Sequence, residues 1–145
     1  MSIKLIEFGT DEYEQMLKLR DEILRIPLKL SIYNENLESE KDDFLIAIFE
    51  EDKILGCCIL TRLTHSTIKL RQMAVKGNFQ HKGLGKALLQ FAERTANENQ
   101  FEKITMDARV DSQGFYQKLG YSTSGEEFSK LNILHIEMEK KLKQT

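Results

Sequence analysis

The chain has 145 residues, a length that suits one domain, residues 1–145, with a single hydrophobic core. Its apolar fraction of 41% and charged fraction of 30% are ordinary for a globular protein, and its formal net charge of −2 excludes the strongly basic character of a sequence-independent nucleic-acid binder. The longest apolar runs, 44–49 and 54–60, are too short to cross a bilayer, and Glu7 and Asp11 would interrupt a signal peptide. We therefore expect a cytoplasmic protein with no membrane or nucleic-acid partner.

The first half of the chain predicts a strand, a helix, a long loop and a hairpin. Residues 2–8 alternate as a strand does, and Thr10 is placed to cap a helix with acidic residues in its first turn. Helical periodicity is lost after Arg25, and Pro27 disfavours helical geometry in the residue before it, so a short helix and a loop are expected next. Two apolar runs joined by a short charged turn then predict an antiparallel hairpin, over 44–49 and 54–63.

A third strand, over residues 67–75, changes its apolar face partway along. Ile68 and Leu70 share one face, but the apolar residues resume one position late, at Met73. Such a slip sends side chains to the opposite face unless one residue is inserted into the strand. We therefore predict a β-bulge near Arg71-Gln72, a feature that often lies beside an active site.

The second half predicts helices alternating with strands. An amphipathic helix begins after two closely spaced glycines, and its apolar stripe is Leu84, Ala87, Leu88, Phe91 and Ala92. A strand, a short helix and two final strands follow, over about 104–108, 112–119, 121–129 and 132–140. The order β-α-loop-β-β-β-α-β-α-β-β predicts a mixed α/β (α+β) domain, largely antiparallel in its first half, with one strand-helix-strand crossover.

The two cysteines, Cys57 and Cys58, are neighbours on a predicted strand. Adjacent strand residues point to opposite faces, so a bridge between them would need an unusual backbone. No His or Cys is spaced nearby as a zinc ligand, and we predict no metal site. These residues are interpreted as small strand residues, with a thiol nucleophile as the alternative.

The loop that carries Gly83 and Gly85 is a candidate phosphate site. It precedes a helix, glycines let a ligand approach the backbone closely, and Lys82 and Lys86 add positive charge. A Walker loop would need a hydroxyl after Lys86, where the chain has Ala87, and a dinucleotide fingerprint would need a third glycine and a parallel sheet. The remaining alternative is a glycine-containing turn that holds no ligand.

Two motifs together resemble those of the GNAT acetyltransferases. Gln80-His81-Lys82-Gly83-Leu84-Gly85 matches the family's Gln/Arg-x-x-Gly-x-Gly/Ala signature and follows a strand that ends Met73-Ala74-Val75. About thirty residues on, Phe115-Tyr116-Gln117-Lys118-Leu119-Gly120-Tyr121 resembles the second hallmark of the family. The resemblance is clear from 44 to 142 and weaker over the first forty residues, where such enzymes vary with their substrates.

The resemblance implies a splayed, mostly antiparallel sheet flanked by helices, with acetyl-CoA as cosubstrate. The bulged strand and the strand at 104–108 would separate, and the pantetheine arm would pair with backbone groups of Met73 and Val75 in the gap. Residues Gln80 to Lys86 would hold the pyrophosphate. The full expected cofactor set is Met73, Ala74, Val75, Gln80, His81, Lys82, Gly83, Leu84, Gly85, Lys86, Phe115, Tyr116 and Lys118.

Amine acetylation needs a neutral amine, a stabilised oxyanion and a proton for the departing thiolate. The resemblance assigns oxyanion stabilisation to the backbone N–H of Met73 and the proton to Tyr116, which sits about 100° from the anchoring Phe115 on its helix. The alternative is that Tyr116 only packs against coenzyme A. The sequence identifies no general base.

Three residues are candidates for contact with the acceptor amine: His135, Arg20 and Arg25. His135 is either part of the acceptor site or a solvated strand histidine, and the two arginines would meet a carboxylate. Acidic residues crowd 35–43, where they either attract a cationic amine or form a solvated loop. The acceptor itself, a small molecule or a peptide, cannot be identified from the sequence.

Other functions stay open at this point. The chain is either an active acetyl-CoA-dependent N-acetyltransferase or a catalytically silent acyl-CoA-binding regulatory module. Transfer to a hydroxyl, or of a longer acyl group, is a third interpretation, and a homodimer is also left open.

Overall fold

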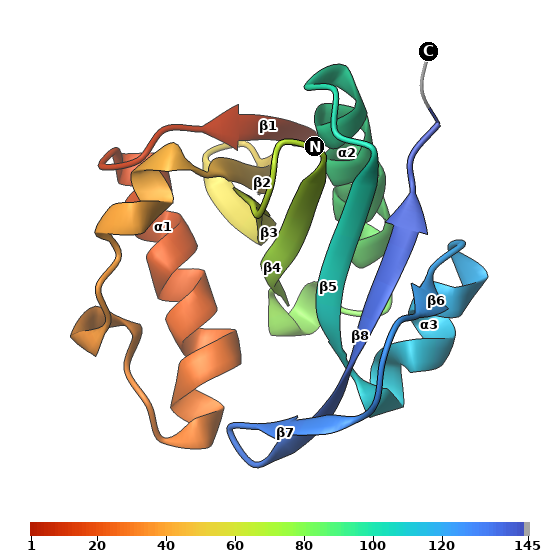
Figure 1. The fold of residues 1–145 in the computed structure, drawn as a ribbon. Coiled ribbons are helices and arrows are strands. Elements are labelled where there is room, and N and C mark those ends of the chain that lie inside the picture. Colours follow the sequence, from red (N-terminus) through yellow and green to blue (C-terminus); the bar gives the residue numbers. More distant parts are fainter. Residues whose placement is uncertain (144–145) are drawn as a thin grey trace.

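A computed structural model describes residues 1–143 as one mixed sheet with helices on both faces (Figure 1). The strand order is β1-β2-β3-β4-β5-β8-β6, and β7 also pairs with β8. The strands are β1 Ser2–Ile6, β2 Phe44–Glu50, β3 Lys53–Arg62, β4 Thr67–Val75, β5 Lys103–Arg109, β6 Ser122–Thr123, β7 Phe128–Lys130 and β8 Ile133–Lys141. The helices are α1 Asp11–Arg20, α2 Leu84–Glu98 and α3 Gln113–Lys118. Only the β4–β5 pair is parallel among these strands, so the predicted mostly antiparallel α/β sheet is confirmed.

The sheet separates two apolar cores. α2 covers one face with Leu84, Leu88 and Leu89, and α1 covers the other with Met16 and Leu17. Strand β3 is buried on both faces, which explains why its sequence reads as an unbroken apolar run rather than as an alternating one. The side chains of adjacent β3 residues therefore enter different cores.

The expected β-bulge is confirmed in β4. Cys57 pairs with Ala74 and Ile59 with Arg71, so one residue of β3 lies opposite two residues of β4. Gln72, one of those two, has a left-handed φ of 58°. Because of the inserted residue, the apolar side chains that follow the bulge resume one position later in the sequence, as the shifted pattern predicted.

β4 and β5 pair only over their first residues and then separate, as the family resemblance implied. Their parallel register runs from Thr67 with Lys103 to Leu70 with Met106 and then stops. The remaining part of β4 faces a gap on this side, and Figure 1 shows the two strands diverging toward the end where α3 begins. The separation places the bulge at the edge of an open space.

The segment between α1 and β2 is more ordered than a plain loop. α1 is capped by Thr10 as expected and continues as a π-helical turn over Asp21–Arg25. Short 3₁₀ turns follow at Ile26–Leu28, Ile32–Asn34 and Glu38–Asp42. Separate short turns do not produce the regular spacing of apolar residues that a long helix has. The sequence beyond Arg25 therefore predicted no long helix.

The strand expected over about 121–129 is split in two. Thr123 pairs with Met138 and Phe128 with His135, so five positions on one strand span three on β8. The two extra residues leave the ladder around Gly125, whose φ is 125°. The prediction of one continuous strand here was wrong, because alternation in the sequence does not reveal where a ladder is interrupted.

Within residues 1–143, no helix combines the length and the apolar character that a membrane span requires.

Candidate active site

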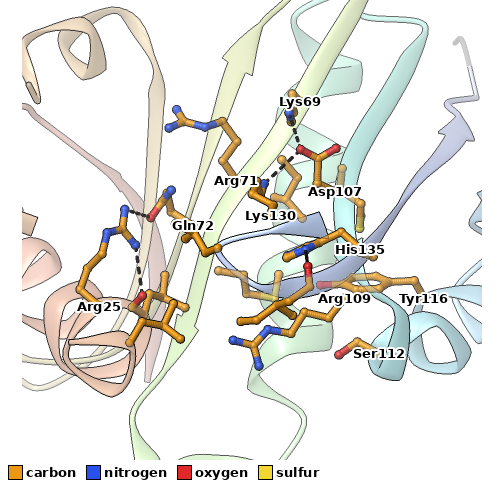
Figure 2. A pocket seen from close by; sticks show the side chains of 18 residues that line it. Arg25, Lys69, Arg71, Gln72, Asp107, Arg109, Ser112, Tyr116, Lys130 and His135 are labelled. Carbon is orange, nitrogen blue, oxygen red and sulfur yellow. Dashed lines mark hydrogen bonds and ion pairs between the residues drawn. The ribbon is translucent and has the colours of Figure 1, made fainter. Parts of the chain in front are cut away.

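A cavity of about 350 Å³ opens where β4 and β5 separate (Figure 2). Its walls come from the segment after α1, the bulged part of β4, the end of β5, the start of α3 and the β7–β8 hairpin. Met73, Tyr116, His135 and Arg25 all line it. These four predicted site residues therefore meet in one place, although they are far apart in the sequence.

The bulge fixes the direction of one backbone amide beside this cavity. The carbonyl oxygen of Gln72 lies 3.8 Å from the Sγ atom of Cys57 on β3. The Gln72–Met73 peptide is trans, and a trans peptide holds its N–H opposite to its C=O. The N–H of Met73 is therefore directed away from Cys57.

The loop before α2 brings a helix N-terminus to the same region. Gly83 is the N-cap residue with φ 84°, and no side chain caps this end of α2. A Cβ atom added to Gly85 would lie 3.8 Å from both Met73 Sδ and Phe115 Cζ. Free amides at a helix N-terminus attract anions, so this helix end beside the bulge is a candidate anion site.

Other residues of the expected cofactor set lie around this loop. Gln80 holds the loop, because its Nε2 donates to the carbonyl oxygen of Val75 at 3.0 Å. The exposed side chains of the set are Gln80, His81, Lys82, Lys86, Phe115 and Lys118. Ala74 is different, because its side chain is buried in the core beneath α1, and only its backbone can meet a ligand.

Tyr116 packs against the α2-side core and lines the cavity. Its ring makes edge contacts with Phe115 and Tyr121, at centroid distances of 5.1 and 6.0 Å. Burial raises the pKa of the Tyr116 hydroxyl, with a smaller contribution from Cys58. Phe115 does not anchor the helix as expected; it is 42% exposed, and Tyr116 and Leu119 make the core contacts.

Arg25 enters the cavity from the α1 side. One guanidinium nitrogen, Nη2, donates to Gln72 Oε1 at 3.0 Å and to Glu35 Oε1 at 3.1 Å. The hydrogen bonds from Arg25 lower the pKa of Glu35 despite partial burial. Arg25 thus ties the variable segment to the bulged residue, and Glu35 is engaged in this contact.

Asp107 on β5 is held between two lysines. Its Oδ2 accepts from Lys69 Nζ at 2.8 Å and from Lys130 Nζ at 3.1 Å. Burial alone would raise the pKa of Asp107, but the two lysines outweigh burial and hold its pKa below the ordinary value. The group stays ionised near neutral pH and is a weak proton acceptor, and the three charges together are positive.

His135 is buried, so the alternative of a solvated strand histidine is wrong. It is 7% exposed and stacks on Phe128 at a centroid distance of 5.8 Å. Its Nδ1 lies 2.8 Å from the carbonyl oxygen of Ile133, which can only accept a hydrogen bond. In the neutral ring, Nδ1 then carries the proton and Nε2 carries the lone pair.

Arg20 lies outside the cavity and is not retained as an acceptor ligand. Its side chain is 1% exposed and forms two hydrogen bonds to Glu40, both 2.8 Å long. The Tyr13 hydroxyl donates to the same carboxylate at 2.7 Å. The guanidinium serves the packing of α1 against the following segment, and a carboxylate of the protein already occupies it.

Sequence reasoning missed the charged residues of the cavity wall. Lys69, Asp107 and Arg109 occupy the polar positions of β4 and β5, between apolar residues that face the core. The alternation was visible, but it does not tell which polar strand positions face water and which face a cavity. Among residues 1–143, no group of His, Cys, Asp or Glu side chains is arranged to hold a metal ion.

Comparison with known proteins identifies the family. The model of the acetyltransferase (GNAT) domain matches residues 22–142. A Bacillus subtilis protein named as an acetyltransferase is 33% identical to this chain over 79 residues. The match covers 54% of this chain and only 54% of the length of that protein. The B. subtilis protein YyaT is 28% identical over 98% of this chain and 97% of its own length.

The fold is shared with solved N-acetyltransferases. The crystal structure of an aminoglycoside 6'-N-acetyltransferase complexed with coenzyme A superposes with a TM-score of 0.82, over 100% of this chain and 99% of that one, at 16% sequence identity. At this sequence identity, the likeness to the solved structure shows a shared fold only. The family assignment rests instead on the family model, which matches most of the chain. The protein belongs to the GNAT acetyltransferase family.

Proposed function

We propose that this chain transfers the acetyl group of acetyl-CoA to a primary amine of a small molecule or peptide. The supporting observation is that Gly85, at the N-terminus of α2, lies against Met73, at the bulge beside the gap between β4 and β5. One extended ligand with phosphates at one end and a thioester at the other would use both features. The coenzyme A complex of the aminoglycoside enzyme supports this choice of ligand.

The cofactor would bind through backbone groups and a few side chains. Its pantetheine arm would lie along the free edge of β4, next to Met73 and Val75. Its pyrophosphate would meet the amides between Gln80 and Lys86, with Lys82 and Lys86 adding positive charge. Phe115, Tyr116 and Lys118 would flank the arm on the α3 side.

The chemistry would be a direct attack. The lone pair of the amine nitrogen forms a bond to the thioester carbon, and the carbonyl electrons move onto oxygen, where the N–H of Met73 stabilises the charge. As the oxyanion collapses, the C–S bond breaks and the Tyr116 hydroxyl gives its proton to the leaving sulfur. The proton lost by the amine nitrogen leaves through water, and Tyr116 is then reprotonated from solvent.

Thermal unfolding with and without acetyl-CoA tests the binding half of this proposal. Ligand at about a hundred times its dissociation constant adds roughly 2.7 kcal/mol to the free energy of unfolding, which raises the midpoint by several degrees. A Gly85→Glu variant should lose this rise, because its carboxylate would repel the phosphates. The variant should still fold, since an acidic residue is favourable in the first turn of a helix.

Gln90→Glu is the matched control, because it adds negative charge at an exposed position of the same helix. It should keep the rise in midpoint. A wild-type protein with no rise at millimolar acetyl-CoA would refute the proposal. Stabilisation without thiol release in the presence of amines would instead identify a silent acyl-CoA-binding module.

A further inference from the structure

Basic side chains dominate the polar wall of the cavity (Figure 2). Asp107 is the one acidic residue among the described residues that line it, and it is shared by two of the cations. Glu35 and Asp43 reach two others from outside the wall, Asp43 at 3.8 Å. The five basic residues are Arg25, Lys69, Arg71, Arg109 and Lys130. Fewer carboxylates than cations meet here, so the cavity carries excess positive charge.

This excess charge does not belong to the expected phosphate site. Lys69 and Arg71 alternate along β4 with Ile68 and Leu70, which point into the core beneath α2. Neighbouring strand residues point to opposite faces, so the cations lie on the α1 face of the sheet. The loop before α2 lies on the other face, and its lysines, Lys82 and Lys86, are not part of the cavity wall. The cations therefore lie on the side of the sheet opposite to the proposed phosphate loop, where an acceptor would be free to bind.

Two of the cations are available to a ligand. Arg109 is exposed, and its side chain makes no hydrogen bond or ion pair with any residue in 1–143. Lys130 has 47% of its side chain exposed while it contacts Asp107. A guanidinium and an ammonium at one cavity are well suited to a carboxylate or a phosphate, which a guanidinium can bind with two parallel hydrogen bonds.

Apolar side chains make up much of the rest of the wall. Leu24 and Leu28 contribute from the α1 side, and Leu131, which is 55% exposed, contributes from the β7–β8 turn with Ile133. A volume of about 350 Å³ is at the small end for ligand pockets. A polycationic acceptor would meet repulsion here, whereas a compact amine with an acidic group and an apolar body would match both parts of the wall.

We propose that the acceptor is a small primary amine that carries a carboxylate or a phosphate, recognised by Arg109 and Lys130. This inference rests on the proposed acetyl transfer and names its substrate class. The anionic group would sit against Arg109 and Lys130, and the amine would point toward Met73 at the gap. Among residues 1–143, no acidic residue of the variable segment lines the cavity, and Glu35 and Glu40 are bound to arginines.

Matched acceptors test the proposal. Thiol release is measured with L-phenylalanine, L-phenylalaninamide and 2-phenylethylamine, which share one apolar body, and with O-phosphoethanolamine and spermidine. We expect kcat/KM to be about tenfold or more higher for an anionic amine than for the neutral or cationic ones, the usual size of a charge-assisted hydrogen bond. The preference should shrink as salt is added. The amino acid and the phosphate ester separate carboxylate from phosphate recognition.

Arg109→Gln should raise KM for the preferred anionic amine about tenfold and leave KM for L-phenylalaninamide unchanged. Arg94→Gln removes the same charge from an exposed position on α2 and should change neither. Equal or better use of neutral or cationic amines, by protein that acetyl-CoA stabilises, would overturn the substrate class alone. Absence of that stabilisation, or stabilisation without thiol release for every amine tested, would overturn the proposed function as well.

Discussion

At the scale of single residues, Tyr116 combines a partly buried ring with a hydroxyl that no described residue engages. None of residues 1–143 forms a hydrogen bond with this hydroxyl, whereas Tyr13 and Tyr121 both bond to glutamates. Burial raises the pKa of Tyr116, so the hydroxyl keeps its proton across the neutral and mildly alkaline range. A group with these properties can donate a proton and is not consumed by a structural role.

Replacement of Tyr116 by phenylalanine removes the donor and keeps the ring. We expect kcat to fall about a hundredfold, the lower range for a general acid, while stabilisation by acetyl-CoA is retained. Steady-state thiol release and thermal unfolding measure the two quantities separately. Turnover equal to that of the wild type would remove Tyr116 from the mechanism and leave it as a packing residue.

At the scale of elements, a buried ion pair joins α1 to the segment before β2. Arg20 and Glu40 are nearly inaccessible, and the Arg20 Nε atom has no partner within the described residues. Burial would raise the pKa of Glu40, but hydrogen bonds from Arg20 and Tyr13 outweigh it and lower the pKa overall. The pair therefore positions the whole segment that carries Arg25 and Glu35.

A Glu40→Gln variant should lose about 3–5 kcal/mol of unfolding free energy, because the Arg20 guanidinium is then buried without its counter-charge. Since the folded-state pKa of Glu40 is depressed, its stabilising effect is present above the ordinary pKa of 4.5 and is lost as the pH falls below it. The difference between wild type and variant should therefore narrow in acid, as followed by denaturant unfolding at several pH values.

Glu38→Gln provides the comparison, because Glu38 is a neighbouring carboxylate with 72% of its side chain exposed. Its ion pair with Lys41 is a surface contact, and its loss should cost less than about 1 kcal/mol. Equal losses for the two variants would show that the Arg20–Glu40 pair does not organise this segment.

Patterns of local sequence predicted most elements. Thr10 fixed the start of α1, the apolar stripe fixed α2, and the shifted alternation around Gln72 located the bulge. The interruption between β6 and β7 and the turns after Arg25 depend on partners distant in sequence, and periodicity carries no information about such partners. The same limit applies to the ion pair that orders the variable segment.

At the scale of the whole molecule, the candidate site is assembled from both ends of the chain. The two motifs pointed to Met73, Tyr116 and the loop before α2, because those features depend on short local patterns. The charges of the cavity come from separate elements: Arg25 from the turn after α1, Arg109 from β5 and Lys130 from β7, which only the fold brings together. The net positive charge of the cavity is therefore a property of the fold, and no short sequence pattern predicts it.

The two-core architecture also makes a prediction about the cysteines. Cys57 belongs to the core beneath α1 and Cys58 to the core beneath α2, so strand alternation places them on opposite faces as expected. Both thiols are fully buried, and burial raises the pKa of Cys57 to about 12 and that of Cys58 well above its ordinary value. Neither is a thiolate at neutral pH, and thiolates are the reactive form.

An aromatic disulfide reagent should therefore modify neither cysteine of the native protein, and both in denaturant. Because the two thiols lie on opposite sides of the central sheet, no local opening of one helix exposes both, and their joint modification should follow global unfolding. In a Cys58→Ala variant, Cys57 is the single target, so its modification reports only on the core beneath α1. Modification of Cys57 in the native variant at the rate of a free thiol would mean that the α1 side opens on its own, which would contradict a single cooperative unit held together by β3.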